Sequence, residues 1–169
     1  VFLDESGCNT DMTRRYAYSF GGSRAVDATP LSKPKNTTIL SSIQLDGTLH
    51  YTTFSGGTTV ERFKRYLETD LLPHLNGSFV LVMDNMKSHH AKAVKNLLDS
   101  SGVRYIYLPS YSPDLNPIEK LWSKVKSFLR KFKARTRDAL PNAIQRAFQT
   151  VSPSDCSGWF HSCGYSPYF

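Results

Sequence analysis

Three acidic residues, Asp4, Asp84 and Glu119, are candidates for metal-dependent chemistry. Asp4 and Asp84 each follow an apolar run, Val1–Leu3 and Phe79–Met83, that predicts a buried strand. Ligand sites in α/β sheets lie at the carboxyl ends of strands, and an unpaired buried carboxylate is costly unless a cation offsets its charge. Mg²⁺ and Mn²⁺ prefer such oxygen ligands, and a pair of ions can activate a water and stabilise a leaving oxygen in phosphodiester cleavage. A site of these three acids would therefore suit phosphoryl transfer.

Spacing alone leaves a second interpretation open for each of these acids. A single Asp could cap a strand end or form a surface ion pair. Asn116-x-x-Glu119 matches a capping box, so Glu119 could simply cap a helix. Acids outside this set are assigned to the surface or to turns: Glu5, Asp11, Asp46, Asp99 and Asp114.

The elements that would position the acids begin with a β-hairpin. Thr37–Leu45 is rich in β-branched residues, Asp46-Gly47 marks a tight turn, and Leu49–Phe54 reads as the returning strand. The preceding segment, Gly7–Asn36, is polar and interrupted by Gly and Pro, which predicts a loop that allows one short strand at Tyr16–Phe20.

Helices and strands then alternate along the rest of the chain. Asn116 is suited to cap a helix that begins at Pro117. The other predicted elements are a helix from Thr58 or Thr59 to about Leu75, a helix at Ala91–Leu98, a strand at Val103–Leu108 and a helix at Asp138–Thr150. This order predicts an α/β fold with a mixed sheet, an antiparallel hairpin plus parallel strands, and helices on both faces.

Charge and length limit the classes of function. The 169 residues suit one domain, and no apolar run reaches the ~18–20 residues that span a bilayer. The formal net charge of +7 favours a polyanionic partner, although charge alone does not separate nucleic acid from an acidic membrane. Three cysteines indicate reduced thiols of an intracellular protein. Cys156, His161 and Cys163 lack a fourth ligand, so zinc is the less favoured interpretation.

The predicted helix that carries Glu119 is strongly basic. At 100° per residue, Lys126, Arg130 and Lys133 share one edge of it with Glu119, beside the apolar stripe. These three residues are therefore predicted to bind DNA phosphates, and a solvated amphipathic face is the alternative. The lysines on the back of the helix are assigned to a solvated surface: Lys120, Lys124 and Lys131.

Three motifs carry a resemblance to a known family. They are Phe2-Leu3-Asp4-Glu5-Ser6-Gly7, then Met83-Asp84-Asn85 with His89, then Tyr111-Ser112-Pro113-Asp114-Leu115-Asn116-Pro117-Ile118-Glu119 with Trp122. The sequence resembles the mariner-like superfamily of DDE transposases, and its bacterial insertion-sequence branch most of all. The 34 residues between Asp84 and Glu119 are typical of that superfamily, and the resemblance runs from Val1 to about Arg130.

The resemblance implies an RNase H-like fold for residues 1–169 and a metal-binding triad of Asp4, Asp84 and Glu119. It implies two Mg²⁺ or Mn²⁺ ions, double-stranded DNA as substrate, cleavage at transposon ends and transfer of the freed 3′-OH into target DNA. Asn85 and His89 would lie beside the site, where His89 orients a phosphate or water or makes a structural hydrogen bond. The resemblance also implies a homodimer, and it favours a bacterial cytoplasm over a eukaryotic nucleus.

Family members also carry an N-terminal helix-turn-helix region that reads the transposon ends. This chain opens inside an apolar run without an initiator Met, so we expect a catalytic fragment that lacks that region. Two alternatives stay open: an RNase H-like nuclease that cuts without joining, and a domesticated, inactive DNA-binding domain.

Overall fold

A five-stranded mixed sheet forms the centre of the protein. The computed structural model describes residues 1–14, 16–31 and 34–165. The strands run in the order β3-β2-β1-β4-β5. Strand β2 pairs antiparallel with both β1 and β3, whereas β4 pairs in parallel with β1 and β5. Their bounds are β1 Phe2–Cys8, β2 Thr37–Ile43, β3 Leu49–Ser55, β4 Val80–Met83 and β5 Arg104–Tyr107. The predicted mixed sheet is confirmed.

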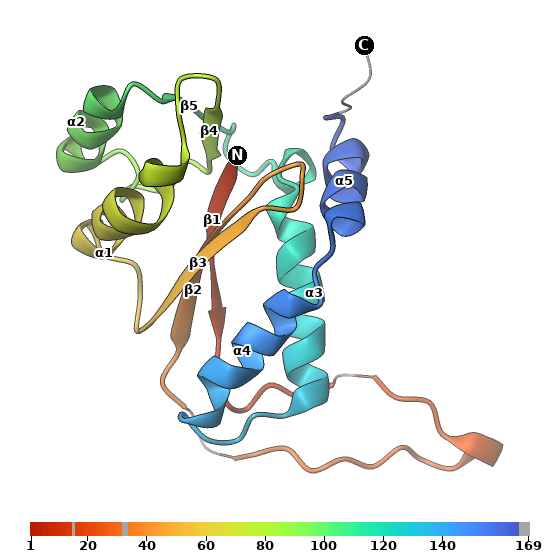
Figure 1. The fold of residues 1–169 in the computed structure, drawn as a ribbon. Helices are drawn as coiled ribbons and strands as arrows, with labels where there is room; N and C mark the ends of the chain where they lie inside the picture. Colours follow the sequence, from red (N-terminus) through yellow and green to blue (C-terminus); the bar gives the residue numbers. More distant parts are fainter. Residues whose placement is uncertain (15, 32–33, 166–169) are drawn as a thin grey trace.

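Helices cover both faces of this sheet, as predicted. Figure 1 shows α1 and α2 on one side, with α3, α4 and α5 on the other. Each side has its own buried apolar cluster, so the sheet lies between two cores. The bounds are α1 Val60–Tyr66, α2 Lys92–Ser101, α3 Ile118–Phe132, α4 Ala139–Gln149 and α5 Pro153–Ser162. None of the helices among the described residues is long and apolar enough to cross a membrane.

Strand β1 divides its side chains between the two cores. Phe2 packs in the cluster of α3, α4 and α5, and Leu3 packs in the cluster of α1 and α2. Because side chains alternate along a strand, Asp4 then faces α3 and Glu5 faces α1. This alternation places the two neighbouring acids in different surroundings.

Strand β1 is longer than the sequence predicted. It continues past Asp4 to Cys8 because β2 pairs with it along its whole length, from Phe2↔Ile43 to Cys8↔Thr37. The prediction that Asp4 closes its strand was therefore wrong. It is the neighbouring strand β4 that ends at this level, at Met83, so parallel pairing covers only Phe2 and Leu3.

The predicted helix from Thr59 to Leu75 is confirmed as a helical stretch, but it is not uniform. The Thr59 side chain caps α1 by accepting a hydrogen bond from the Arg62 amide at 3.3 Å. After α1 the chain widens into a π-helical turn at Leu67–Leu71 and ends in a 3₁₀ turn at Leu72–His74. A proline within this last turn removes an amide donor, which explains why the regular helix does not continue.

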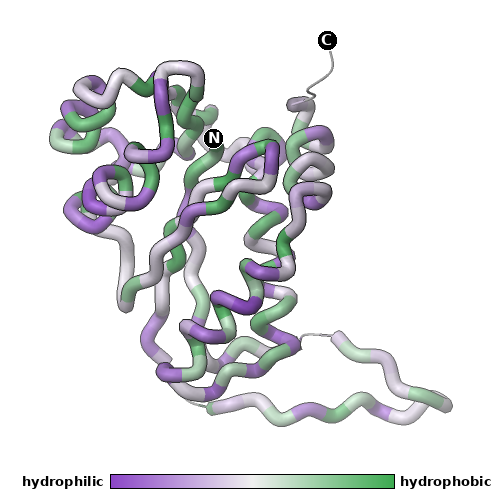
Figure 2. The backbone as a smooth tube through the Cα atoms, in the orientation of Figure 1, coloured by the Kyte–Doolittle hydropathy of each residue, from purple (hydrophilic) through white to green (hydrophobic). Residues whose placement is uncertain are grey.

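Residues 9–14, 16–31 and 34–36 form an extended arm that projects from the body of the protein (Figure 1). The strand allowed at Tyr16–Phe20 is not formed, and the arm contains only a 3₁₀ turn at Phe20–Gly22. Figure 2 shows that apolar positions, in green, recur along this arm away from the body. Its base is held by Arg135, which donates to the carbonyl oxygens of Thr10 and Met12 at 3.1 and 3.0 Å.

The C-terminal helix α5 was not predicted, although the sequence carries its signal. Ser152 accepts a hydrogen bond from the Asp155 amide, and Asp155 accepts one from the Ser152 amide, which completes a capping box. Pro153 occupies the first turn, a position that proline favours. Cys156 and Cys163 are buried in this region, and like Cys8 they are free thiols.

Candidate active site

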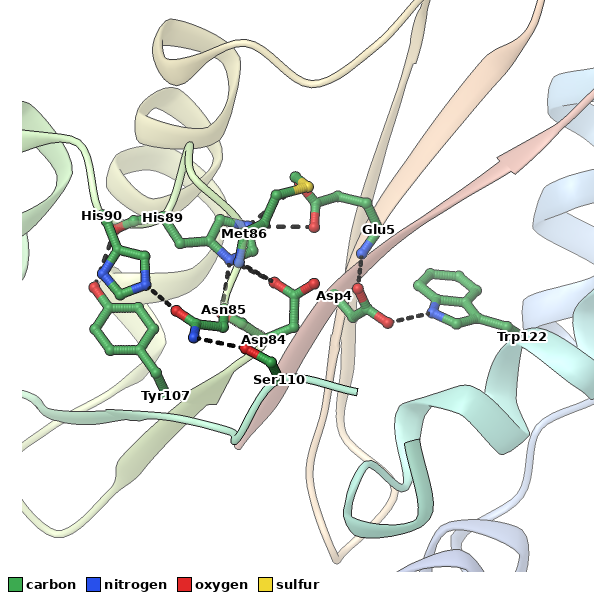
Figure 3. Close-up of polar contacts among 10 residues, drawn as sticks. All are labelled: Asp4, Glu5, Asp84, Asn85, Met86, His89, His90, Tyr107, Ser110 and Trp122. Carbon is green, nitrogen blue, oxygen red and sulfur yellow. Dashed lines mark hydrogen bonds and ion pairs between the residues drawn. The ribbon is translucent and has the colours of Figure 1, made fainter. Parts of the chain in front are cut away.

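Asp4 and Asp84 are brought together by the pairing of β1 with β4. The register aligns Phe2 with Val82 and Leu3 with Met83, so one further step places Asp4 beside Asp84. Both carboxylates line one pocket, and Figure 3 shows them adjacent. The early end of β4 leaves this edge of β1 open beyond Leu3, which is what makes room for the pocket.

Glu119 reaches the same pocket from α3. After β5 the chain turns back across the site, and Tyr111 adopts a left-handed backbone (φ 59°) within this connection. Glu119 then lies in the first turn of α3 with an exposed side chain that lines the pocket. The structure thus gathers the three predicted acids in one cavity.

Asp4 is a buried carboxylate held by two donors. Only 7% of the residue is exposed. The Glu5 amide donates to its Oδ1 at 2.7 Å, and the Trp122 indole Nε1 donates to its Oδ2 at 3.1 Å. Burial raises the pKa of Asp4 to about 7, against these hydrogen bonds and with help from the charges of Asp84 and Glu5. Trp122, which the sequence analysis gave no role, therefore contacts a site residue directly.

Asp84 has a different environment, and only one of its oxygens is engaged. Its Oδ1 accepts from His89 Nδ1 at 2.8 Å and from the Met86 amide at 3.2 Å. Burial alone would raise the pKa of Asp84, but the hydrogen bond and charge of His89 outweigh it and lower the pKa. Within the described residues Oδ2 accepts no hydrogen bond, so it is available to a ligand.

Behind Asp84, His89 joins two carboxylates that are far apart in the sequence. Its side chain is fully buried, and its Nε2 lies 3.3 Å from both carboxylate oxygens of Glu5. Burial opposes the charged ring, yet Asp84 and Glu5 together raise the pKa of His89 to about 10. The assignment of Glu5 to the surface was wrong, because its side chain is only 9% exposed. The extension of β1 past Asp4 is what turns Glu5 inward.

Glu5, Asp84 and His89 also form the one group among the described residues whose ligand atoms lie within 4.8 Å of one another, as a metal site requires. We interpret the group as an ion-pair chain, because each ring nitrogen of His89 already faces a different carboxylate. A metal ion between them would need one of these nitrogens without its hydrogen.

The pocket of Asp4, Asp84 and Glu119 suits a divalent cation better. Its donors are carboxylate oxygens, and Asn116 adds a buried side-chain oxygen with no hydrogen-bond partner in the described part of the chain. Hard oxygen donors of this kind fit Mg²⁺ or Mn²⁺. Asp4 in addition forms no ion pair with a basic side chain of the described residues, so a cation would offset its charge.

The capping box, which was the alternative interpretation of Asn116 and Glu119, is not formed. The α3 helix begins with no side-chain cap, and the Glu119 amide instead donates to the backbone carbonyl of Asn116 at 3.1 Å. Because the backbone takes this donor, the Asn116 side chain is left facing the pocket. The capping interpretation of Glu119 therefore has no support in the structure.

Asn85 lines the pocket, in the position beside the acids that the family resemblance implied. Its Nδ2 donates to the Ser110 hydroxyl at 3.2 Å, and its Oδ1 contacts His90 Nε2. Figure 3 shows Asn85, in the segment that follows β4, in contact with Ser110, in the segment that follows β5. The amide thus ties together two segments that line the pocket.

The predicted DNA-binding residues lie along and just beyond α3. Lys126 and Arg130 are half-buried and line a second pocket beside the end of β1. Lys133 follows the helix in a left-handed conformation (φ 57°) and pairs with Asp27 of the arm at 2.6 Å. Asp27 therefore partly neutralises the charge of Lys133, which makes this side chain less available to bind a phosphate. Phosphate binding by these residues stays a prediction.

Comparison with known proteins identifies the family. A family model described as DDE superfamily endonuclease matches residues 1–141. The chain belongs to the DDE superfamily of endonucleases. This DDE domain is 30% identical over 97 residues to the Tc1 transposase of Caenorhabditis elegans, and 34% identical over 77 residues to the Tcb2 transposase of Caenorhabditis briggsae. These matches cover 55% and 46% of the domain but only 36% and 28% of the relatives.

Solved structures of Mos1 transposase share the fold. A paired-end complex with the left transposon end matches with a TM-score of 0.79 at 20% identity, over 96% of this chain and 51% of that one. A Mos1 mariner paired-end complex with Mn matches with the same score at 21% identity, over 99% and 56%. The catalytic domain of Mos1 mariner transposase matches with a TM-score of 0.71 at 17% identity, over 96% and 75%. At these identities the likeness establishes the RNase H-like fold of the DDE domain.

Proposed function

We propose that this DDE domain is the catalytic domain of a cut-and-paste DNA transposase and that Asp4, Asp84 and Glu119 hold two Mg²⁺ or Mn²⁺ ions. The observation that carries the proposal is the meeting of three carboxylates, from β1, the end of β4 and the start of α3, in one open pocket of a DDE-family fold. The relatives are transposases, and structural neighbours are complexes with transposon-end DNA or with Mn.

The proposed reaction has two phosphoryl transfers. Water first hydrolyses a phosphodiester at the transposon end, which frees a 3′-OH, and this hydroxyl then displaces a 3′-oxygen from a target phosphodiester. When bound, the divalent ions would favour deprotonation of the attacking oxygen and stabilise the charge on the leaving oxygen. Most of the rate in such transfers comes from positioning and charge stabilisation.

The side chains of the domain provide that positioning. Trp122 fixes Asp4 from α3, and His89 fixes Asp84 through Oδ1, which leaves Oδ2 without a donor among the described residues. Glu119 adds a third carboxylate from an exposed position, where substrate can reach it. Asn116 contributes a neutral oxygen to the same wall.

Binding of the DNA backbone is proposed for the basic edge of α3. Lys126, Arg130 and Lys133 follow Glu119 along this helix and its end, so a strand that places its phosphate in the pocket would run past them. Such contacts hold the strand without reading its sequence. We further propose that a helix-turn-helix region outside these residues reads the transposon ends.

A homodimer is part of the proposal. The arm exposes large side chains almost completely, with Tyr16, Tyr18 and Phe20 at 89%, 105% and 99% exposure. A projecting aromatic surface of this kind is suited to pack against a second copy of the chain. We also propose that the protein acts on DNA inside a bacterial cell. Only the motif resemblance supports this host, because the relatives named above are nematode proteins.

A cleavage and joining assay tests this function. The chain is incubated with Mn²⁺ or Mg²⁺ and labelled duplex, and in parallel with a duplex that carries a pre-cut 3′-OH end. Asp4→Asn and Asp84→Asn should abolish nicking, whereas Asp138→Asn, an exposed acid outside the pocket, should cut like wild type. Joining of the pre-cut end separates a transposase from a nuclease that only cuts. Wild-type rates in either pocket variant would contradict the triad.

A further inference from the structure

His89 has more contacts than a residue at the edge of a site needs. Its ring is fully buried and stacks on Phe63 with ring centroids 4.2 Å apart. Its own carbonyl oxygen accepts a hydrogen bond from the Tyr107 hydroxyl at 3.0 Å, and its amide donates to the Met86 carbonyl at 3.0 Å. The backbone and the ring plane are therefore both fixed. The remaining degree of freedom is a half-turn of the ring about the Cβ–Cγ bond, which keeps the plane but exchanges the nitrogens with ring carbons.

Glu5 fixes that last degree of freedom. Its carboxylate faces the ring nitrogen that Asp84 does not contact, and both of its oxygens are 3.3 Å from Nε2. With Nε2 held by Glu5, Nδ1 is directed at Asp84 Oδ1, where it lies at 2.8 Å. Figure 3 shows His89 in contact with both carboxylates, and Asp84 beside Asp4, with which it lines the pocket.

The consequence for Asp84 is an asymmetric carboxylate. Oδ1 receives two donors, His89 Nδ1 and the Met86 amide, and no donor among the described residues reaches Oδ2. A carboxylate fixed in this way presents a single oxygen in one orientation to the pocket. Partners that hold a metal ligand from behind typically contribute about 10- to 100-fold to metal affinity.

We propose that Glu5 and His89 are positioning residues that fix Asp84 as a single-oxygen ligand and thereby set the affinity of the site for its divalent ion. The inference rests on the proposed function, because it takes Asp84 to be a metal ligand. It extends that function to two residues on the α1 side of the sheet, away from the pocket.

Two replacements of His89 separate positioning from a structural role. The side-chain nitrogen of Asn lies as many bonds from Cβ as Nδ1 of His, and that of Gln as many as Nε2. His89→Asn therefore keeps a donor for Asp84 and releases Glu5, whereas His89→Gln keeps a donor for Glu5 and releases Asp84. Both variants lose the stacking on Phe63, so a structural role predicts equal effects.

The readout is Mn²⁺ affinity of the DNA-free chain, measured by calorimetric titration and checked by the signal of free Mn²⁺ in electron paramagnetic resonance. We expect His89→Gln to weaken binding by roughly 10- to 100-fold, and His89→Asn to bind at least about threefold more tightly than His89→Gln. Glu5→Gln, which keeps the shape of the side chain, should fall between wild type and His89→Gln. His161→Asn, on an exposed face of α5, serves as the matched control at wild-type affinity.

Different outcomes would overturn the positioning role of Glu5 and His89 and the proposed metal site itself. Equal affinities in His89→Asn and His89→Gln, or values within about twofold of wild type in both, would overturn the positioning role. Wild-type affinity in Glu5→Gln would remove Glu5 from it, even if a His89 variant failed to fold. If wild type itself does not bind Mn²⁺, or Asp84→Asn binds it equally well, the proposed metal site fails first.

Discussion

Replacing Asp4 with Asn should stabilise the metal-free protein at neutral to alkaline pH, although it removes a proposed metal ligand. Burial raises the pKa of Asp4 from 3.8 to about 7. The folded protein thus holds this proton more tightly than the unfolded chain does, and the stability of the wild type decreases as pH rises from about 4 to about 7. Asn carries no charge, so it avoids this cost.

The size of the effect follows from the pKa and the two hydrogen bonds. A pKa that is about 3 higher in the folded protein than in the unfolded chain lowers the free energy of unfolding by roughly 4 kcal/mol at pH 8, and by less than about 1 kcal/mol at pH 4. Asn has one acceptor oxygen, so it loses either the Trp122 or the Glu5 amide hydrogen bond, at a cost of about 1–1.5 kcal/mol. The net gain at pH 8 is about 2–3 kcal/mol, or about 5–10 °C in Tm for a chain of this size.

The assay is denaturant unfolding and thermal melting in EDTA at pH 8 and pH 4. Asp84→Asn is the matched control with the opposite sign, because it removes the partner that His89 contacts at 2.8 Å and should destabilise the protein. Adding Mg²⁺ at pH 8 should raise the Tm of wild type only. A less stable Asp4→Asn at pH 8, or a gain of equal size at pH 4, would refute the reasoning about Asp4.

Three further predictions concern Glu119, the basic edge and specificity. Glu119→Gln should keep the wild-type Tm, because α3 has no side-chain cap for the change to remove. The variant should lose cleavage and joining but still bind DNA. Full activity would remove Glu119 from the triad. Replacing Lys126, Arg130 and Lys133 with Ala should reduce the slope of DNA affinity against salt concentration by about one per lost phosphate contact. Lys133 should contribute least, because Asp27 already pairs with it. An unchanged slope would mean that these residues form a solvated surface. In competition assays the chain should prefer terminal-repeat duplex over random duplex by less than roughly 100-fold, which corresponds to about 2.7 kcal/mol, because phosphate contacts do not read sequence. A stronger preference would mean that the domain itself reads bases.

The sequence predicted the fold where the pattern is local. The apolar run before Asp84 identified β4, since a strand buried on both faces is apolar throughout. The hairpin around Asp46-Gly47 was predicted from β-branched residues and turn chemistry, and the turn is present with the Gln44 amide bonded to the Thr48 carbonyl. The family motifs gave Asp4, Asp84 and Glu119, which the structure brings into one pocket.

What the sequence did not predict depends on contacts between distant segments. The second half of β1, which includes Glu5, is too polar to resemble a strand, and β2 supplies its hydrogen bonds from residues 37–41. Glu5 is buried only because His89, 84 residues away, balances its charge. Spacing likewise suggested that Asn116 caps α3, whereas the backbone carbonyl of Asn116 takes the Glu119 amide instead.

The location of bound metal tests the central claim most directly. Crystals of the chain soaked in Mn²⁺ can be studied by anomalous diffraction, which identifies the ion independently of any activity. We predict anomalous density in the pocket, with oxygen contacts from Asp4 and from Oδ2 of Asp84, at about 2.1–2.2 Å as for other small divalent ions. Mn²⁺ bound instead between Glu5 and His89, or absent from the pocket in crystals that bind it elsewhere, would contradict the account.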